Sequence, residues 1–366
     1  MLLDAIIIGA GLAGLCCARR LQRGGSRVLV LEKSRGLGGR LATRRVDNQP
    51  VDHGCKFLQS TNSLMVQLID RLQERRILLP WQAACYNIAD DGHLKAEPYS
   101  DRFVAPLGMT TVAKELAEGL DIWRQTRVTG LVWEDSSEES MESAWRLEVE
   151  TPARPIQEPL RAKAVILAVP APQALALLQS IQSQIPFALV QSLKQAVFYP
   201  TISVMAGYEM IPLPTELSEE KQGWLINGNP NTPFTWVGLD SSKRVSLAHP
   251  TIVIHSSAQF AESYLQTDDL NLAGLDLLKQ TSECLHIDLT QPSWTQTHRW
   301  RYATPVEGAS DGELLSETPL PLACCGDWCR GTDAGAAMES GWQAAEKIYE
   351  YFDSKPANSA VNSKLF

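Results

Sequence analysis

The sequence predicts an α/β fold with two parts: a discontinuous domain built on a parallel sheet, and a second domain with a mainly antiparallel sheet and flanking helices. Two observations predict this division. Short apolar runs that lead into helix-like segments occur near the start, the middle and the end of the chain. Residues 190–290 instead alternate apolar and polar residues, are rich in β-branched and aromatic types, and contain Asn-Gly turn signals.

The first element is a β-α-β unit. Residues 5–8 form a continuous apolar run, as expected of a strand buried on both faces of a parallel sheet. Residues 12–23 predict a helix that ends at Gly24–Gly25, and residues 27–32 predict the next strand. This arrangement is typical of the opening of a Rossmann-type domain.

Further pieces of the same domain lie far along the chain. The run at 164–169 stops at Pro170 and precedes a helix-like segment, and the run at 321–328 precedes a long segment with helical spacing. An additional helix is expected within 269–286. The expected boundaries are 1–75, 100–185 and 295–350 for the first domain, 76–99 and 186–294 for the second, and 353–366 for a flexible tail.

Composition and charge restrict the partners of the chain. With 366 residues, 44% of them hydrophobic and 20% charged, the chain has the make-up of a globular protein. A net charge of −9 disfavours nucleic acid or an anionic membrane surface as partner. No apolar stretch reaches the roughly 20 residues of a membrane helix, and the N-terminus lacks the pattern of a secretory signal. We therefore expect a cytoplasmic monomer that acts on a small molecule.

The eight cysteines do not form a metal-binding or disulfide pattern. Cys16 and Cys17 are adjacent on the first predicted helix, and the cluster of Cys324, Cys325 and Cys329 has no nearby histidine. No metal site is therefore predicted. The cysteines are expected to be small buried residues.

The residues between the first strand and helix fit a dinucleotide-binding turn. Gly9, Gly11 and Gly14 follow the G-x-G-x-x-G spacing, which permits a tight turn, close approach to a pyrophosphate and close packing of helix on strand. Ala13 lies within this stretch, and Glu32 ends the second strand where an acid can accept hydrogen bonds from a ribose. An ordinary tight turn competes with this interpretation, but the strand, helix and acid favour a dinucleotide.

NAD and FAD both use such a unit, and the residues after Glu32 favour FAD. Gly38 and Gly39 leave no side chain where the chain passes the cofactor, and Arg40 adds a cation that faces the diphosphate. A glycine-rich surface turn competes with this interpretation. Lys33 could meet the 2′-phosphate of NADP, but the neighbouring Glu32 would repel that phosphate.

The C-terminal stretch "CGDWCRGTDAGAAMESG" supports FAD independently. Gly326 and Asp327 follow a predicted buried strand, where the carboxylate can accept hydrogen bonds from a ribityl chain. Small residues then open a helix, among them Ala334, Gly335 and Ala336, whose backbone N–H groups can lie against the flavin. An ordinary N-terminal cap formed by Asp327 is the competing interpretation.

On these motifs, together with "VDHGCKF", "PLGMTTVAKEL" and "HRWRYATP", the sequence resembles the glutathione-reductase-type flavoproteins of the amine oxidase group. Within that group it is most similar to renalase-like proteins. The resemblance implies a non-covalently bound FAD, with His53 and Lys56 near the flavin ring. Phe57 and Val128 complete the expected cofactor contacts. The first domain is then the FAD-binding domain and the second the substrate domain.

The resemblance also implies a reaction: oxidation of dihydro-NAD(P) isomers, with hydride transfer to the flavin and with oxygen as acceptor, giving NAD(P)+ and hydrogen peroxide. A dihydropyridine is already an activated donor, so such a site needs orientation more than acid or base. Trp300 is expected to pack beside the oxidised ring, and Arg299 or Arg301 to meet a substrate phosphate. Trp300, Arg301 and His53 are therefore the catalytic candidates. Strand packing for the first two and a structural role for His53 compete with this assignment.

Two other functions remain open. The first is a flavin amine oxidase, in which aromatic residues such as Tyr199, Tyr208, Trp224 and Trp236 enclose the substrate, although core packing of the sheet is the favoured role for each of them. The second is a low-turnover sensor or interaction module that binds FAD and NAD(P)H.

Overall fold

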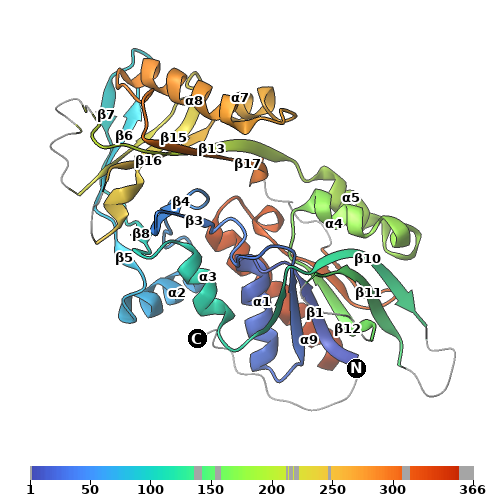
Figure 1. The fold of residues 1–366 in the computed structure, drawn as a ribbon. Coiled ribbons are helices and arrows are strands. Elements are labelled where there is room, and N and C mark those ends of the chain that lie inside the picture. Colours follow the sequence, from blue (N-terminus) through green and yellow to red (C-terminus); the bar gives the residue numbers. More distant parts are fainter. Residues whose placement is uncertain are drawn as a thin grey trace.

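The computed structural model describes residues 2–135, 142–152, 158–211, 213, 217, 222–245, 249–306 and 314–353. They form two large sheets with helices on their faces, the first at the lower right of Figure 1 and the second at the upper left, and two short two-stranded sheets. The predicted fold class is confirmed: the first sheet has a parallel centre and the second is mainly antiparallel. The expected flexible tail lies outside the described residues from residue 354 onward.

Five parallel strands form the centre of the first sheet in the order β9–β2–β1–β12–β19. Antiparallel strands β10, β11 and β18 extend it. The strands are β1 (Leu2–Ile8), β2 (Val28–Glu32), β9 (Asp121–Arg124), β10 (Arg127–Glu134), β11 (Ala144–Glu150), β12 (Leu160–Leu167), β18 (Leu315–Ser316) and β19 (Leu322–Cys324). Segments far apart in sequence therefore meet in one sheet, as the recurring apolar runs predict.

Helices cover both faces of this sheet. Along β1, Ala5 and Ile7 pack into the core beneath α1 and α9, whereas Ile6 and Ile8 pack into a second core beneath α4 and α5. This alternation explains why β1 is an unbroken apolar run. The helices on the first side are α1 (Leu12–Arg23), α2 (Ser63–Glu74), α3 (Thr110–Ala117) and α9 (Ala334–Asp353), and those on the second are α4 (Ala171–Leu177), the 3₁₀ helix η1 (Gln179–Gln184) and α5 (Phe187–Gln195).

The second sheet has the order β17–β13–β16–β15–β14–β6–β7, and every pair except β14–β6 is antiparallel. Its strands are β6 (Ala84–Ile88), β7 (Leu94–Ala96), β13 (Phe198–Gly207), β14 (Trp224–Asn227), β15 (Phe234–Leu239), β16 (Thr251–Ser256) and β17 (Trp294–Pro305). Strand β17 belongs to this sheet, although the expected boundary placed 295–350 with the FAD-binding segments. Its long pairing with β13 depends on residues about 90 positions away, which local patterns do not reveal.

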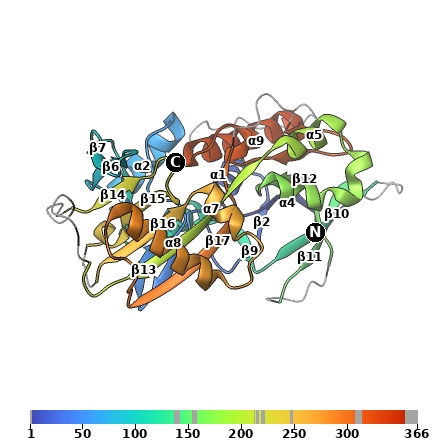
Figure 2. The same ribbon diagram turned by 90° about the horizontal axis from the view of Figure 1, so that it is seen from above.

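The two faces of the second sheet have different partners. Helices α7 (Ala258–Ser263) and α8 (Leu270–Leu285) lie over β13, β16 and β17 in Figure 2. Ile202, Val204 and Ile254 face these helices, whereas Met205 and Val253 join the core of the first sheet. The second face is therefore turned toward the first sheet and its helices.

Short elements connect the two halves. They are the hairpin of β3 (Thr43–Val46) and β4 (Gln49–Asp52), the pair β5 (Leu79–Pro80) and β8 (Phe103–Val104), and the 3₁₀ turns η2 (Asp240–Lys243) and η3 (Asp327–Cys329). The strand predicted before Gly326 is confirmed as β19, which ends at Cys324, and η3 follows. The predicted helices at 12–23 and within 269–286 are confirmed. Within the described ranges, none of the helices has the length and apolar character needed to cross a membrane.

Candidate functional site

The turn between β1 and α1 has the tight geometry that its glycines predict. Gly9 has φ of 108°, and its N–H donates to the carbonyl of Leu31 at 2.8 Å. A Cβ at Gly14 would collide with the carbonyl oxygen of Gly9 and would lie 2.9 Å from the Cβ of Ala168, so helix and strand pack closely here. A Cβ at Gly11 would meet no heavy atom within 4 Å. Gly9 and Gly14 therefore allow close packing, and Gly11 leaves open space.

Glu32 holds the loops around this turn. Its Oε2 accepts from the N–H of Ala10 at 2.9 Å, and its Oε1 accepts from the N–H of Ser34 at 2.7 Å. The exposed Lys33 donates to Gln173 at 3.2 Å. The predicted ribose-binding acid is therefore fixed in place beside the glycine turn.

The Gly38–Gly39 segment crosses directly over the glycine turn. The N–H of Gly38 donates to the carbonyl of Ala10 at 2.8 Å, and a Cβ at Gly39 would lie 3.4 Å from the Cα of Gly11. Both residues have positive φ, 101° and 54°, which glycine adopts without strain. Gly11 and Gly39 thus form a cradle without side chains, to which we refer as the glycine cradle.

Arg40 and Asp327 bind each other across the two ends of the chain. Arg40 Nη1 and Nη2 donate to the two carboxylate oxygens of Asp327 at 2.6 and 2.5 Å, and Nη1 also donates to the carbonyl of Ala303 at 2.8 Å. The sequence predicts these two side chains at different parts of a cofactor. The structure joins them into one polar group that borders the glycine cradle from the C-terminal side.

The N-terminal cap of α9 is Asp333. Asp333 Oδ1 accepts from the N–H of Ala336 at 2.7 Å, so Asp333 caps α9 and Asp327 does not. Ala334 and Gly335 open the helix, and a Cβ at Gly335 would collide with Thr61. The small residues therefore let the helix end approach the loop before α2.

Two further cofactor candidates are less distinctive. Val128 is a buried residue of β10 in the core beneath α4 and α5. Phe57 lies beside Trp81, with 6.2 Å between ring centroids. Nothing in their surroundings separates a cofactor contact from packing.

These residues fit FAD. The glycine cradle leaves space for a diphosphate, Glu32 borders the place of a ribose, and Gly38–Gly39 closes over the turn without side chains. FAD would be held by Gly11, Gly39 and Glu32 at its adenosine half, and by Arg40 and Asp327 further along.

A second group of residues comes from the end of β4 and from β17. Trp300 Nε1 donates to the carbonyl of His53 at 3.0 Å, and their rings stack with centroids 5.6 Å apart. His298 packs edge-on against Trp300 at 4.3 Å and against His53 at 5.0 Å. The structure thus brings together His53 and Trp300, two of the three residues predicted as catalytic.

The third, Arg301, does not join them. It is exposed, and the alternation of strand side chains directs it away from Trp300. Arg299 donates to the carbonyls of Tyr264 and Thr267 at 3.3 and 2.7 Å, on the side of the sheet that α7 and α8 cover. Neither arginine lies where the predicted contact to a substrate phosphate requires it.

Strand register adds three residues that no sequence motif indicates, His298, Ser203 and His255, and aligns them with Trp236. The four residues stand directly opposite one another on β17, β13, β16 and β15, so they form one row on the face turned toward the first sheet. Lys56 lies over this row, with Nζ 5.4 Å from the ring of Trp236. Only the pairing of the strands could have revealed the row.

The four aromatic residues considered for a substrate cage lie in different environments. Trp236 lies in the row. Trp224 and Tyr208 pack beneath the helix-covered face, where the hydroxyl of Tyr208 donates to Leu289 at 3.0 Å, and Tyr199 is exposed. Only Trp236 of the four can contact a substrate on this side.

The histidines of this region are neutral at physiological pH. Burial, together with His298 and Arg44, lowers the pKa of His53 to about 3, and burial with Arg44 lowers that of His298 to about 4. Burial and the nearby Lys56 and Lys243 lower the pKa of His255 well below its usual value. His53 Nδ1 and His255 Nε2 are buried and have no hydrogen-bond partner among the described residues.

A buried charge network borders this region, and its members all lie within the interior of the protein. Arg244 Nη2 donates to Asp52 at 3.0 Å and to Asp240 at 2.8 Å, and Lys243 Nζ lies 2.6 Å from Asp240. Arg244 also donates to the carbonyls of Pro50 and Ala105, both at 3.0 Å. The network therefore ties β4 to η2 and joins the two halves of the molecule.

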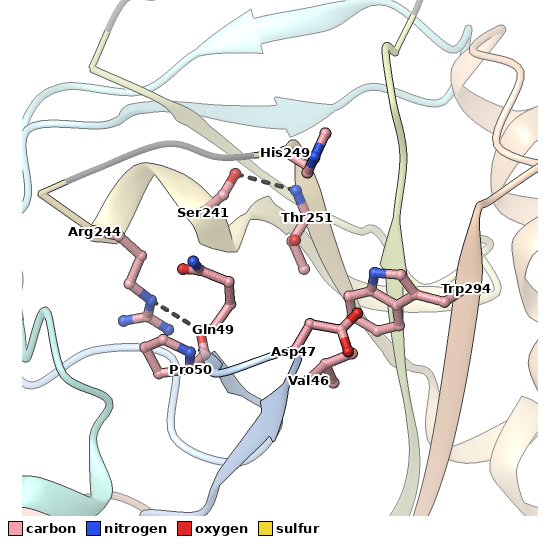
Figure 3. A pocket seen from close by; sticks show the side chains of 9 residues that line it. All are labelled: Val46, Asp47, Gln49, Pro50, Ser241, Arg244, His249, Thr251 and Trp294. Carbon is pink, nitrogen blue, oxygen red and sulfur yellow. Dashed lines mark hydrogen bonds between the residues drawn. The ribbon is translucent and has the colours of Figure 1, made fainter.

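A small pocket of about 70 Å³ lies at the other end of the same sheet face (Figure 3). Arg244 closes one side, where its Nε donates to Pro50, and Trp294 closes another. Trp294 and Trp300 are six residues apart on β17, or roughly 20 Å along the strand. The pocket is therefore separate from the group around Trp300.

The cysteines are buried or half-buried, and none is in a disulfide. Cys324 lies on β19, and burial raises the pKa of its thiol to about 12. In the described part of the chain, no cluster of three His, Cys, Asp or Glu side chains is placed to hold a metal ion.

Comparison with known proteins covers nearly the whole chain. Residues 7–72 match the family model of NAD(P)-binding Rossmann-like domains, and residues 74–349 match that of flavin-containing amine oxidoreductases. A Mycobacterium tuberculosis protein described as a flavin-containing monoamine oxidase, AofH, is 42% identical over 69 residues, which are 19% of this chain and 15% of that relative.

Solved structures show the same fold. A putrescine oxidase superposes with a TM-score of 0.70 at 16% identity, and cyclohexylamine oxidase from Brevibacterium oxydans IH-35A with a TM-score of 0.66 at 15% identity. Each alignment covers 96% of this chain and 99% of the other.

Proposed function

The chain belongs to the flavin-containing amine oxidoreductase family, and from this membership and the site geometry we propose that it is an FAD-dependent oxidase of a small amine. One observation carries the proposal. Strand β17 bears Trp300, which stacks on His53, and three residues later the carbonyl of Ala303, which binds Arg40. The expected substrate side and cofactor side therefore meet on one strand, roughly 10 Å apart.

When bound, FAD would accept two electrons and a proton from the donor and pass the electrons on to oxygen. In the overall reaction the amine loses one hydrogen from carbon and one from nitrogen, becomes an imine, and oxygen becomes hydrogen peroxide. The residues of the chain need only bind and orient the amine, because no proton has to be taken up from the protein in this balance. This agrees with a site of neutral histidines.

The charges of the site favour an amine in its neutral form. Asp52 and Asp240 are both paired with Arg244 and Lys243, and Lys56 lies on the same side. An ammonium group would find no unpaired carboxylate among these residues, whereas the ring faces of Trp300 and Trp236 can pack against a neutral donor.

A specific observation supports a second candidate, oxidation of dihydro-NAD(P) isomers. Lys56 is a cation without a counter-ion in the described part of the chain, which suits a donor that carries negative charge. Family membership supports the amine, and the lysine supports the dinucleotide.

An anaerobic titration tests both candidates. The purified yellow protein is mixed with monoamines and, separately, with dihydro-NAD(P) isomers, and the flavin absorbance is followed before air is admitted. We expect bleaching by amines and formation of peroxide in air. Bleaching by the isomers alone would replace the amine with the dinucleotide. If neither donor bleaches the flavin, the chain is not an oxidase of these classes, and a sensor function gains support.

A further inference from the structure

Lys56 is a half-buried residue whose ammonium group has no polar partner among the described residues. Its Nζ lies 5.4 Å from the ring of Trp236, and it forms neither an ion pair nor a hydrogen bond with any residue of the described ranges. An aromatic face compensates a partly desolvated cation only in part. A charge that is partly removed from water is normally paired, so Lys56 is a candidate to bind an anion from outside the chain.

The nearest carboxylates are already neutralised. Asp52 accepts from Arg244 and from the hydroxyl of Thr43 at 2.6 Å, and Asp240 binds Lys243 and Arg244. Two carboxylates thus face two cations within the buried network. Lys56 is left as a positive charge without a carboxylate partner among the described residues.

A second, independent observation points to a polar occupant. His255 Nε2 is buried without a partner, while the ring is held by a hydrogen bond to the backbone of His53. Lys56 lies close enough to lower the pKa of this histidine. An occupant beside Trp236 that offers an anionic oxygen to Lys56 and an N–H or O–H donor to His255 Nε2 would satisfy both side chains.

We propose that the substrate carries an anionic group, a carboxylate or a phosphate, whose oxygen atoms pair with the Lys56 ammonium beside Trp236. The inference rests on the proposed oxidase function, since it assigns the occupant to the donor of that reaction. Burial and Lys243 lower the pKa of Lys56 to about 8, so the side chain is still mainly cationic at pH 7. Such a donor is an amine that bears an acid group, or an anionic dinucleotide.

The test uses non-oxidisable ligands of one shape and different charge. Benzoate, phenyl phosphate, benzamide and benzamidine are titrated into the holoenzyme, and binding is followed by the perturbation of the flavin absorbance. We expect at least one of the two anions to bind about tenfold or more tightly than benzamide, as a charge-assisted hydrogen bond provides. The stronger of the two identifies the anionic group.

Three variants assign the effect to Lys56. Lys56→Met should remove the preference for the anion and leave benzamide binding unchanged, while Lys56→Arg should retain the preference. Lys114→Met, which removes an exposed lysine of α3, should behave as the wild type. Equal anion affinity in Lys56→Met and wild type would overturn the inference, as would a preference of the wild type for benzamidine.

Labelling gives a readout that does not depend on turnover or on the flavin spectrum. The protein is acetylated with and without the anion, and the extent of reaction at each lysine is measured by mass spectrometry. Protection of Lys56 but not of Lys114 supports the inference, and equal labelling contradicts it. If the protein binds the anion but no donor bleaches its flavin, the oxidase function is refuted, whereas the anion site is supported.

Discussion

The guanidinium of Arg40 donates two hydrogen bonds, of 2.6 and 2.5 Å, to the carboxylate of Asp327, although the two residues are 287 positions apart in sequence. Arg40 also binds the carbonyl of Ala303 on β17. One side chain therefore connects the glycine cradle, the second sheet and the C-terminal segment. We expect this pair to position whatever binds along the cradle.

Replacement of Arg40 should weaken FAD binding. Because Arg40→Met removes charge-assisted hydrogen bonds to Asp327 and Ala303, we expect the dissociation constant of FAD to rise about 10- to 100-fold. Flavin content after gel filtration and titration of the apoprotein measure this change. Asp327→Asn should have a similar effect, and the double variant should lose less than the sum of the two. Full flavin content in Arg40→Met would refute a role of Arg40 in FAD binding. Arg27→Met, which removes a surface ion pair with Asp4, is the control and should bind FAD as the wild type does.

Two glycine variants should separate folding from cofactor binding. At Gly14 a Cβ would collide with the backbone of Gly9, so Gly14→Ala should lower the free energy of unfolding by about 1–3 kcal/mol. At Gly11 a Cβ has room, so Gly11→Ala should fold normally but hold FAD more weakly. Chemical denaturation of the apoproteins and FAD titration measure the two effects. A Gly11→Ala protein with unchanged FAD affinity would mean that the cradle is not the diphosphate site.

The buried charge network should dominate the response to acid. Burial alone would raise the pKa of Asp52, but Lys243 and Arg244 with two hydrogen bonds lower it overall. A depressed pKa stabilises the folded state at neutral pH, and this contribution is lost as the pH falls below about 5 toward the folded-state pKa. Asp52→Asn should cost about 3 kcal/mol at pH 7, since it leaves two buried cations, Lys243 and Arg244, with Asp240 as their one carboxylate partner in the network.

The difference in unfolding free energy between wild type and Asp52→Asn should then shrink as the pH is lowered from 6 to 3. Asp4→Asn, at a partly exposed pair with Arg27, should cost less than about 1 kcal/mol. A constant difference across this pH range would show that Asp52 does not titrate with unfolding.

Variants at Lys56 and at His53 should differ in their effect on how anion affinity depends on pH. Anion affinity should decrease as the pH rises through about 8, because the ammonium of Lys56 is lost there. In Lys56→Arg the affinity should stay constant from pH 6 to 10, since a guanidinium keeps its charge. His53→Gln should leave the profile between pH 5 and 8 unchanged, because the pKa of His53 is about 3. An inflection near pH 6 that this variant removes would assign proton transfer to His53.

Sequence patterns predicted correctly those features whose residues lie close together in the chain. The apolar run of β1, the glycine spacing and the acid at Glu32 lie within 32 residues, and the structure has them together as expected. The pairing of Arg40 with Asp327 was not predicted, because each was assigned to a different part of the cofactor. Their contact follows from the position of β19 beside β12, which is a long-range property.

The substrate side was less predictable for a geometric reason. Trp300 and Arg301 are neighbours in sequence, but a strand sends them to opposite faces, and only the pairing of β17 with β13 decides which face is which. His255 and Trp236 carried no motif. They join the site because β16 and β15 align them with Ser203 and His298.

The place of β19 and α9 has a consequence for how the protein is made. Strand β12 lies between β1 and β19, and α1 packs against α9, so the N-terminal nucleotide turn borders elements that leave the ribosome long after it. A nascent chain stopped before Leu322 would already contain both glycines of the cradle but would expose the apolar sides of α1 and β12. Such a product should be recognised by chaperones and degraded, and the cofactor should be acquired only after α9 has been synthesised.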